Sequence, residues 1–509
     1  MSELPVATPL YLDYAASTPV DPVVASVMAD ALRDPGLAAN PAAGTHGPGR
    51  EAAARVEAAR AEVAALIGAD PGEIIFTSGA TEADNLAIIG AARFLAGRGR
   101  HLVTALTEHK AVLESCRHLA REGWRVTWLR PDAHGRIEPS AVAAALEPGT
   151  VLVSLMHANN ETGMVTDVAA IGALCRARGV LLHVDAAQSA GLLPVDVRAM
   201  AVDLLSLSAH KLYGPKGVGA LFIDRERVRR VEPLLFGGGQ ERGLRPGTLA
   251  THQVLGMGAA CRIAGARREA DRRHVTALRD RLWARLSGLP GVLPNGDPAA
   301  GTGHILNVSV AGVEGESLHA QLAETLAVAS GAACTSLTDE PSAVVRALGR
   351  SPALARSSVR FSFGRETTGA DVDRAAACFE VAVGALRAQG PDGPPPDPPG
   401  PRAGSVLARG EAGTEEAGTR VLVVARIRAG RIAGLEARVF GCPGTRAAGD
   451  RAVARLTGAP ATDLAALTLA DLEGPADGPR APAGRLLIVQ DALRNCLADW
   501  ENGGLKSAP

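Results

Sequence analysis

Short apolar runs alternate with alanine-rich stretches between residues 74 and 223, and this alternation restricts the possible folds more than any other feature of the chain. The runs span residues 74–76, 101–104, 125–129, 151–155, 180–184, 204–207 and 219–223. Strands that alternate with helices predict a mainly parallel sheet covered by helices, here with seven strands, so the expected fold class is α/β. Ligands of such sheets bind beyond the carboxyl ends of the strands. The residues that follow these runs are therefore the candidates for a site.

A second, smaller α/β segment follows at about residues 262–386. We expect a first region at residues 1–388, with a large domain at about 16–261 and a small domain at about 262–388 that includes the N-terminal segment. Seven prolines between Pro391 and Pro401 indicate an extended, semi-rigid linker at residues 389–404.

Beyond this linker the pattern changes. Residues 420–427 and 432–440 alternate apolar and polar positions around Ala429 and Gly430, which predicts a β-hairpin. Helices at about 446–456 and 491–500 would complete a small α+β domain at residues 405–509.

Composition argues against several classes of partner. The net charge is −1 over 509 residues, which gives no reason to expect nucleic acid or a membrane surface as a partner. No run approaches the roughly 20 apolar residues of a membrane span, and the N-terminus lacks the basic and apolar regions of a signal peptide. The seven cysteines form no paired framework, which fits a reducing compartment and predicts a cytoplasmic protein.

A lysine and an aspartate stand where two of the apolar runs end. Lys211 follows the run 204–207 in a Ser-Ala-His-Lys string, and Asp185 directly follows the run 180–184. A lysine can form a Schiff base with the aldehyde of pyridoxal phosphate (PLP), and a carboxylate can keep the pyridine nitrogen protonated so that the ring withdraws electrons. Taken alone, Lys211 would be interpreted as a solvated surface charge. The acid at the neighbouring strand end favours a PLP site instead.

Three further strings follow predicted strands. The string Phe-Thr-Ser-Gly-Ala-Thr-Glu from Phe76 enters a helix whose free amides attract an anion, so we expect the Ala80 amide and the Thr81 hydroxyl to hold the cofactor phosphate. His109 would stack on the cofactor ring and move protons, although a lone histidine is more often a packed or surface residue. Asn160 would hydrogen-bond the phenolic oxygen of the cofactor, with a turn asparagine as the alternative interpretation.

Together these strings resemble the motifs of the cysteine desulfurases of the NifS/IscS type. The resemblance runs from Leu10 to about residue 386, with the motifs in the same order. The matching strings are Leu10-Tyr-Leu-Asp-Tyr-Ala-Ala-Ser-Thr-Pro, Asn40-Pro-Ala-Ala, Thr77-Ser-Gly-Ala-Thr-Glu, Thr107-Glu-His-Lys, Asn159-Asn-Glu-Thr-Gly, Ser208-Ala-His-Lys-Leu-Tyr-Gly-Pro, Gly237-Gly-Gly-Gln-Glu-Arg-Gly-Leu-Arg-Pro-Gly-Thr, Ser330-Gly-Ala-Ala-Cys and Ser357-Ser-Val-Arg-Phe. The resemblance implies a homodimeric fold-type I PLP enzyme that converts L-cysteine to L-alanine and an enzyme-bound persulfide.

The same resemblance implies a role for each residue around the cofactor ring. Lys211 would carry the cofactor, and Asp185 would pair with the pyridine nitrogen. His109 would stack on the ring. Gln188 and Asn160 would contact the ring oxygen, and Asn160 would also face the substrate.

The remaining roles concern the phosphate and the substrate. By the resemblance, Thr81, Ser208 and His210 bind the phosphate. Thr248 would reach the phosphate of the partner subunit, so that each site is shared. Arg360 would bind the substrate carboxylate, a role that suits a planar fork of two donors.

Cys334 is the expected nucleophile. It lies in a small, polar string, Ser-Gly-Ala-Ala-Cys-Thr-Ser, whose loop-like character suits a thiol that reaches the cofactor and then presents its sulfur elsewhere. Its persulfide would contact a nascent iron–sulfur cluster only transiently. Four other thiols lie in helical stretches and are expected to be packing residues: Cys116, Cys175, Cys261 and Cys378.

The C-terminal region resembles the U-type (NifU/IscU-like) iron–sulfur scaffold proteins. The resemblance rests on the string Val-Phe-Gly-Cys-Pro-Gly-Thr around Cys442, and on residues 490–500 as the counterpart of the scaffolds' final helix. These scaffolds hold a cluster on three cysteines and an aspartate. The other ligand positions align near Ala417, Thr419 and Arg485, and Cys496 lies inside the final helix, so the resemblance implies a degenerate module. Since thiolates must converge to hold such a cluster, we expect no stable cluster, with Cys442 a sulfur acceptor or a remnant.

Three functions remain open at this point. The favoured one is a cysteine desulfurase, with an iron–sulfur scaffold or another sulfur-acceptor protein as its partner. The second is a related PLP lyase that acts on selenocysteine. The third is an assembly or docking subunit without catalysis, which would not require Lys211, Asp185, His109, Cys334 and Arg360 together.

Overall fold

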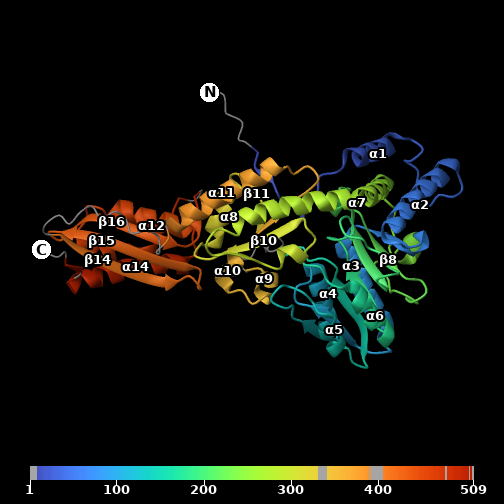
Figure 1. The fold of residues 1–509 in the computed structure, drawn as a ribbon, viewed down its shortest axis with the longest axis horizontal. Coiled ribbons are helices and arrows are strands. Elements are labelled where there is room, and N and C mark those ends of the chain that lie inside the picture. The colour runs from blue at the N-terminus through green and yellow to red at the C-terminus, as the bar shows by residue number, and fades with distance from the viewer. Residues whose placement is uncertain are drawn as a thin grey trace.

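The computed structural model describes residues 8–330, 341–388, 390, 405–475, 478–503 and 505–506. Figure 1 shows an elongated molecule in which a large domain, a small domain and a C-terminal module follow one another. Helix α7 (Thr251–Leu286) runs from the large domain into the small domain, and the C-terminal module packs on the far end of the small domain.

Each apolar run between residues 74 and 223 forms a strand of one seven-stranded sheet. The strands are β2 (Ile74–Thr77), β3 (His101–Ala105), β4 (Arg125–Leu129), β5 (Thr150–Met156), β6 (Leu181–Asp185), β7 (Leu204–Ser208) and β8 (Gly219–Ile223). Their order is β2-β8-β7-β6-β5-β3-β4, and β8 is antiparallel to both of its neighbours while the other pairs are parallel. The prediction of a mainly parallel sheet is confirmed.

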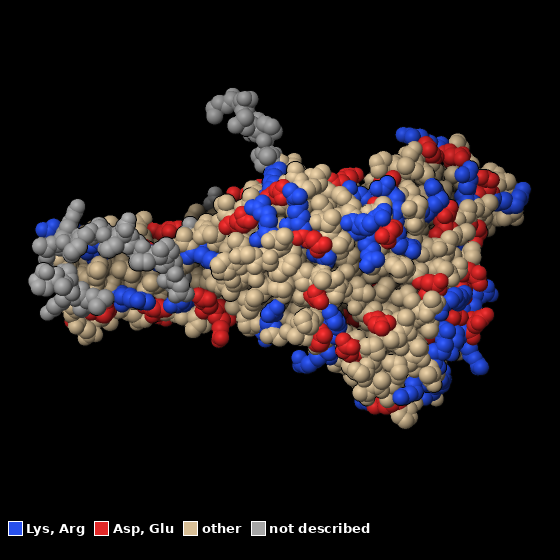
Figure 2. Space-filling view, viewed as in Figure 1, with Lys and Arg blue, Asp and Glu red and all other residues tan. Residues whose placement is uncertain are grey.

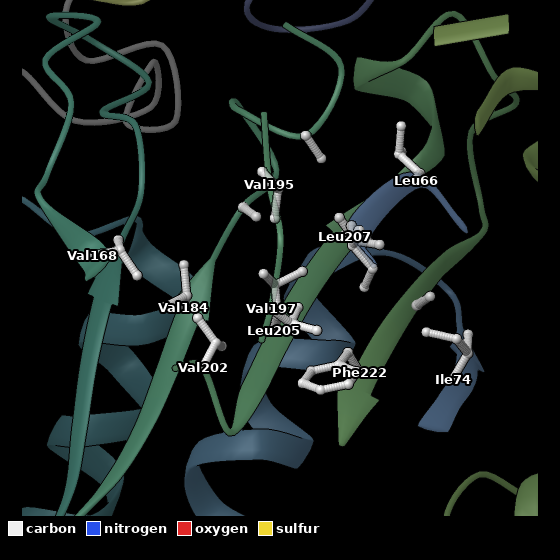
Figure 3. Close-up of a cluster of buried hydrophobic side chains, with 14 of the residues drawn as sticks. Leu66, Ile74, Val168, Val184, Val195, Val197, Val202, Leu205, Leu207 and Phe222 are labelled. Carbon is white, nitrogen blue, oxygen red and sulfur yellow. The ribbon is translucent and has the colours of Figure 1, made fainter. Parts of the chain in front are cut away.

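Helices cover both faces of this sheet because the strand side chains alternate between two apolar cores. Phe222 of β8 lies in the first core, whereas its neighbours Leu221 and Ile223 lie in the second. Figure 3 shows part of the first core, where Leu205 and Leu207 of β7 lie close to Phe222. Burying each such side chain stabilises the fold by about 1.5–3 kcal/mol. The covering helices are α2 (Gly47–Ile67), α6 (Val168–Arg178) and the start of α7 on the first face, and α3 (Ala80–Leu95) and α4 (Lys110–Arg121) on the second.

Helix α7 crosses the expected boundary between the two domains without a break. Its residues Val254 and Met257 belong to the first core of the large domain, whereas Leu278 and Leu282 belong to the core of the small domain. The boundary expected at residues 261 and 262 therefore falls inside a helix. A continuous helix gives no change of composition at which a sequence would mark the boundary.

The small domain is built on a four-stranded antiparallel sheet in the order β12-β13-β10-β9. The strands are β9 (Val292–Pro294), β10 (Ile305–Val310), β12 (Ala329–Ser330) and β13 (Val359–Ser362), and the helices are α8 (Gly315–Ala323), α9 (Ala343–Ala347), α10 (Pro352–Arg356) and α11 (Gly369–Ala388). The N-terminal segment joins this domain, because β1 (Leu10–Tyr11) pairs with β11 (Leu326–Ala327) and Leu12 lies in the small-domain core. Helices α1 (Pro22–Arg33) and α5 (Pro139–Ala145) lie outside the small domain.

The C-terminal module is an antiparallel sheet with helices packed on it. The expected hairpin is present as β15 (Thr419–Arg428) and β16 (Arg431–Phe440), followed by α12 (Pro443–Leu456). Strand β14 (Ser405–Thr414), which the sequence did not predict, pairs with β15 along its whole length. The last helix, α14 (Ala483–Glu501), begins eight residues earlier than expected, directly after Pro482. The module also contains a 3₁₀ helix at Ala461–Ala465 and the short elements α13 (Leu469–Leu472) and β17 (Leu505–Lys506).

Charged side chains of both signs are interspersed on the surface that Figure 2 shows. This mixture agrees with the net charge of −1. Among the helices of the described residues, none combines the length and the apolar character that a membrane span needs.

Candidate active site

A cavity of about 850 Å³ brings together most of the residues that the sequence singled out. Ten of them line it: Ala80, Thr81, His109, Asn160, Asp185, Gln188, Ser208, His210, Lys211 and Arg360. Arg360 comes from β13 of the small domain, whereas the others come from the large domain. The cavity therefore lies between the domains, beyond the carboxyl ends of β6 and β7, which is where an α/β sheet binds its ligands.

Lys211 and Asp185 approach the cavity from neighbouring parallel strands. Asp185 is the last residue of β6, and Lys211 ends the short 3₁₀ turn Ala209–Lys211 that follows β7. The Asp185 side chain is nearly buried, and its Oδ1 accepts a hydrogen bond from the Ala187 amide at 2.9 Å. The Lys211 ammonium donates to the Ala15 carbonyl oxygen. A lysine and a buried acid thus face one cavity from fixed backbone positions.

The other end of the cavity can hold an anion. Helix α3 begins at Ala80 without a side-chain cap, so the amides of its first turn are left for another acceptor. Ser208 and His210 face the same region. Burial and the charges of Lys211 and Lys216 lower the pKa of His210 to about 4. His210 is therefore neutral at physiological pH and would contribute a hydrogen bond rather than a positive charge.

His109 is fixed by its own helix. Its backbone forms the N-cap of α4, and its Nδ1 accepts a hydrogen bond from the Ala111 amide at 3.1 Å. In the neutral ring the proton is then on Nε2. His109 can therefore offer that N–H to a group in the cavity.

Gln188 and Asn160 are held by backbone contacts. The Gln188 amide donates from Nε2 to the Ala15 carbonyl at 2.7 Å, and its Oε1 lies 3.3 Å from Nε2 of His304. Burial, followed by the charges of Lys211 and Arg360, lowers the pKa of His304 to about 3, so this imidazole is neutral. Asn160 accepts from Arg360 through its backbone carbonyl.

Arg360 has the geometry expected of an anion-binding residue. Its side chain is nearly buried, with Nη1 donating to the Asn160 carbonyl at 2.7 Å and Nη2 donating to Oδ1 of Asp13 at 2.6 Å. Its Nε is buried and has no hydrogen-bond partner among the residues that the structure describes. A buried N–H without an acceptor is costly, so this atom fits an incoming carboxylate.

Two expected site residues remain, Thr248 and Cys334. Thr248 is exposed and does not line the cavity of its own chain. Cys334 lies outside the described residues. Pro341 and Ser342, which follow the segment that contains Cys334, do line the cavity. The expected packing thiols behave as predicted, because Cys116, Cys175 and Cys261 are buried and Cys378 is half-buried.

Sequence reasoning missed two carboxyl groups behind Asp185. Asp84 on α3 and Glu108 before α4 are both buried, and Asp84 lies 3.6 Å from His183. Burial, together with the negative charge of Asp185, raises the pKa of each well above its usual range. The neutral form of both groups is therefore favoured. Both stand inside the Thr-Glu-Ala-Asp and Thr-Glu-His strings, but no spacing in the sequence marks them as buried.

The positions compared with scaffold ligands lie where the C-terminal module contacts the small domain. Nη2 of Arg485 is 3.9 Å from where a Cβ on Gly418 would lie, and 3.3 Å from Oε1 of Glu316 on α8. The Ser317 hydroxyl donates to the Gly441 carbonyl at 2.7 Å. The adjacent Cys442 is 1% exposed.

These contacts bear on the expected role of the module. The thiol of Cys442 lies 3.1 Å from the Thr445 hydroxyl and is enclosed in the docked arrangement, so it is not presented to an incoming sulfur. Cys496 is buried within α14, away from the end of that helix. Within the described ranges, no three His, Cys, Asp or Glu side chains are grouped as metal ligands.

The residues around the cavity fit PLP. The uncapped start of α3 suits a phosphate, the buried Asp185 suits a protonated ring nitrogen, and Lys211 suits a covalent bond to an aldehyde. The unpartnered Nε of Arg360 suits the carboxylate of an amino acid on such a cofactor.

Comparisons with known proteins agree with this geometry. The family model for class-V aminotransferases matches residues 10–375. Cysteine desulfurase IscS of Aeromonas salmonicida is 53% identical over 383 residues, which cover 75% of this chain and 95% of that protein. Cysteine desulfurase IscS of Vibrio campbellii is 54% identical over the same shares.

Solved structures give the same result. A NifS-like protein matches with a TM-score of 0.68 and 32% identity, covering 74% of this chain and 99% of its own. The structure described as SspA in complex with cysteine matches with a TM-score of 0.61 and 35% identity, covering 70% of this chain and 100% of its own. The family match ends at residue 375, before the C-terminal module begins. The chain belongs to the class-V aminotransferase family and, within it, to the cysteine desulfurases of the IscS/NifS type.

Proposed function

We propose that this cysteine desulfurase binds PLP on Lys211 and transfers the sulfur of L-cysteine to Cys334 as a persulfide, releasing L-alanine. The Cys334 thiolate forms the new S–S bond as the substrate C–S bond breaks. The electron pair of the broken C–S bond stays on the substrate carbon. In the overall balance, this carbon gains the proton that the substrate thiol loses. The reaction needs no external oxidant, because the substrate carbon is reduced while the two sulfurs are oxidised.

The convergence of ten separately predicted residues on one cavity supports this proposal most strongly. The bound cofactor would supply an electron-withdrawing ring that stabilises negative charge on the substrate carbons. The chain supplies the rest. Asp185, the carboxyl group at the end of β6 that lines the cavity, favours a protonated ring nitrogen. His109 offers its Nε2 to move a proton at the substrate, and Arg360 orients the substrate through its carboxylate.

A homodimer with shared sites is part of the proposal. Thr248 is exposed outside the cavity of its own chain, where it is free to contact a second copy. Two large apolar side chains of the preceding segment are also exposed, Leu235 at 52% and Phe236 at 88%. Exposed apolar groups of this size suit a protein interface.

We further propose that the C-terminal module is a scaffold-like domain that no longer assembles a cluster. Three of its four ligand positions hold Ala417, Thr419 and Arg485, and none of these is a thiolate or carboxylate. Since Cys442 is enclosed, we assign the role of sulfur acceptor to a separate protein, such as an iron–sulfur scaffold. The six described cysteines are free thiols, which suits a reducing cytoplasm.

Mass spectrometry of the protein after treatment with L-cysteine tests the sulfur transfer. One added sulfur should appear on the peptide that contains Cys334. The Cys334→Ser variant should bind PLP normally and gain no sulfur, because a hydroxyl is a far weaker nucleophile than a thiolate. Sulfur found only on another cysteine would contradict the assignment.

A further inference from the structure

Glu161 joins the two domains at the wall of the cavity. It lies in the turn after β5, and its backbone amide donates to Oδ1 of Asn159 at 2.9 Å. From the small domain, the Asn307 amide donates to the Glu161 carbonyl at 3.0 Å, and the Ser342 hydroxyl donates to its Oε2 at 2.5 Å. Glu161 is therefore held at its backbone carbonyl by Asn307 and at its carboxyl group by Ser342, both more than 140 positions away in the sequence.

Among the described residues, the charged or titratable groups that act on Glu161 are Arg360 from β13, and His109 and Lys110 from the start of α4. Burial raises the pKa of Glu161 to about 7, although the Ser342 hydrogen bond and these three residues act in the opposite direction. In the absence of substrate, both protonation states are therefore populated near neutral pH.

The substrate adds a negative charge to this cluster. Its carboxylate is expected at Arg360, which already binds the carboxylate of Asp13 at 2.6 Å. A second anion beside Arg360 partly cancels the positive charge that favours ionised Glu161, and it also repels that carboxylate directly. Both effects favour the protonated form of Glu161. The Ser342 hydrogen bond survives protonation, because a neutral carboxyl group keeps an acceptor oxygen.

We propose that Glu161 takes up a proton when the substrate carboxylate binds to Arg360, so that anion binding is coupled to proton binding at the junction of the two domains. This inference rests on the proposed role of Arg360 in substrate binding. Glu161 acts here as a positioning residue, which adjusts its charge to the ligand while it keeps the domains joined. By linkage, carboxylate binding should weaken as pH rises above about 7, with a slope equal to the number of protons taken up.

Calorimetry on the holoenzyme tests the coupling directly. The probe is 3-mercaptopropionate, which has the carboxylate and thiol of the substrate but no amino group to react with the cofactor. Binding is measured at pH 7.5 in phosphate and in Tris, whose different ionisation heats reveal the protons exchanged. The wild type should take up roughly half a proton or more per site. Glu161→Gln, which keeps an acceptor for Ser342, should bind the probe with that uptake lost and with little dependence on pH.

Matched variants separate the possible failures. Glu108→Gln makes the same chemical change at another carboxyl group that lines the cavity, whose pKa burial raises well above its usual range, so it should keep the uptake of the wild type. If Arg360→Ala binds the probe as tightly as the wild type does, the assignment of Arg360 as the carboxylate-binding residue is wrong. If binding depends on Arg360 but Glu161→Gln keeps the full uptake, the proposal for Glu161 is overturned.

A second variant covers the case in which Glu161→Gln does not fold. Ser342→Ala removes a hydrogen bond that favours the ionised carboxylate, so the midpoint of the proton uptake should move to higher pH. An unchanged midpoint in Ser342→Ala would also overturn the proposal.

Discussion

Replacing Arg360 with alanine should weaken the binding of L-cysteine far more than it slows the later steps. The guanidinium donates to Asn160 and Asp13 and keeps a buried Nε without a partner. A substrate carboxylate that binds through this fork forms charge-assisted hydrogen bonds in a largely water-excluded site. Losing them should cost about 2–4 kcal/mol, which corresponds to an increase of about 30- to 900-fold in KM.

Two companion variants sharpen this prediction. Arg360→Lys keeps the positive charge, but an ammonium cannot reproduce the planar fork, so it should restore KM only partly. Asp13→Asn leaves Arg360 in place and removes the carboxylate that competes with the substrate, so KM should stay equal or fall. The assay is steady-state alanine formation on protein that is fully loaded with cofactor. An unchanged KM in both Arg360 variants, or a large rise in KM for Asp13→Asn, would refute this account of substrate binding.

Three further outcomes follow from contacts elsewhere in the chain. Arg60→Met leaves Glu241 buried without the guanidinium that it binds at 2.7 and 2.8 Å. This should destabilise the fold by about 3–5 kcal/mol and lower the melting temperature. An unchanged melting temperature would show that the ion pair contributes little to stability. Exchanging the charges of Glu316 and Arg485 tests the docking of the C-terminal module on the small domain. Each single reversal should make the protein more sensitive to protease between these two parts, by an effect of about 1 kcal/mol or less, and the double reversal should restore protection. Equal digestion of the wild type and the three variants would argue against this contact. Burial raises the pKa of Cys116, Cys175, Cys261 and Cys496 to about 12. Only about one part in ten thousand of each thiol is then thiolate at pH 8, so iodoacetamide should label Cys334 first. Faster labelling of any of these four cysteines than of Cys334 would contradict their burial.

The sheet of the large domain could be predicted because its strands are buried on both faces. Such strands read as continuous apolar runs, and β5, β6 and β7 have no exposed residue. The functional residues at their ends could be found for the same reason, since Asp185 directly follows the run 180–184 and Lys211 follows the run 204–207 after three residues.

Strand β14 shows why the C-terminal module was harder to predict. Its sequence contains two glycines and few β-branched residues, which argues against a strand. In the structure, a Cβ on Gly410 would lie 2.1 Å from the Ala492 carbonyl of α14, so the glycine allows the helix to pack closely on the strand. The residue that weakens the sequence signal is required by a contact that only the folded module contains.

The sequence could not reveal the contact of Glu161 with the small domain, because its partners lie far from it along the chain. Ser342 lies 181 residues after Glu161, and Asn307 lies 146 residues after it. Each of these residues has an ordinary interpretation alone, as a turn acid, a helix cap or a strand asparagine. Their shared role depends on the way the small domain packs over the turn after β5.

The most direct test of the whole account is the conversion of L-cysteine by the purified full-length protein, measured as alanine and sulfide in the presence of a thiol reductant. We predict equal amounts of the two products from the wild type, and none from Lys211→Ala, because that variant cannot form the covalent bond to the cofactor. Turnover at the wild-type rate by Lys211→Ala, or sulfide release without alanine, would contradict a desulfurase that works through Lys211.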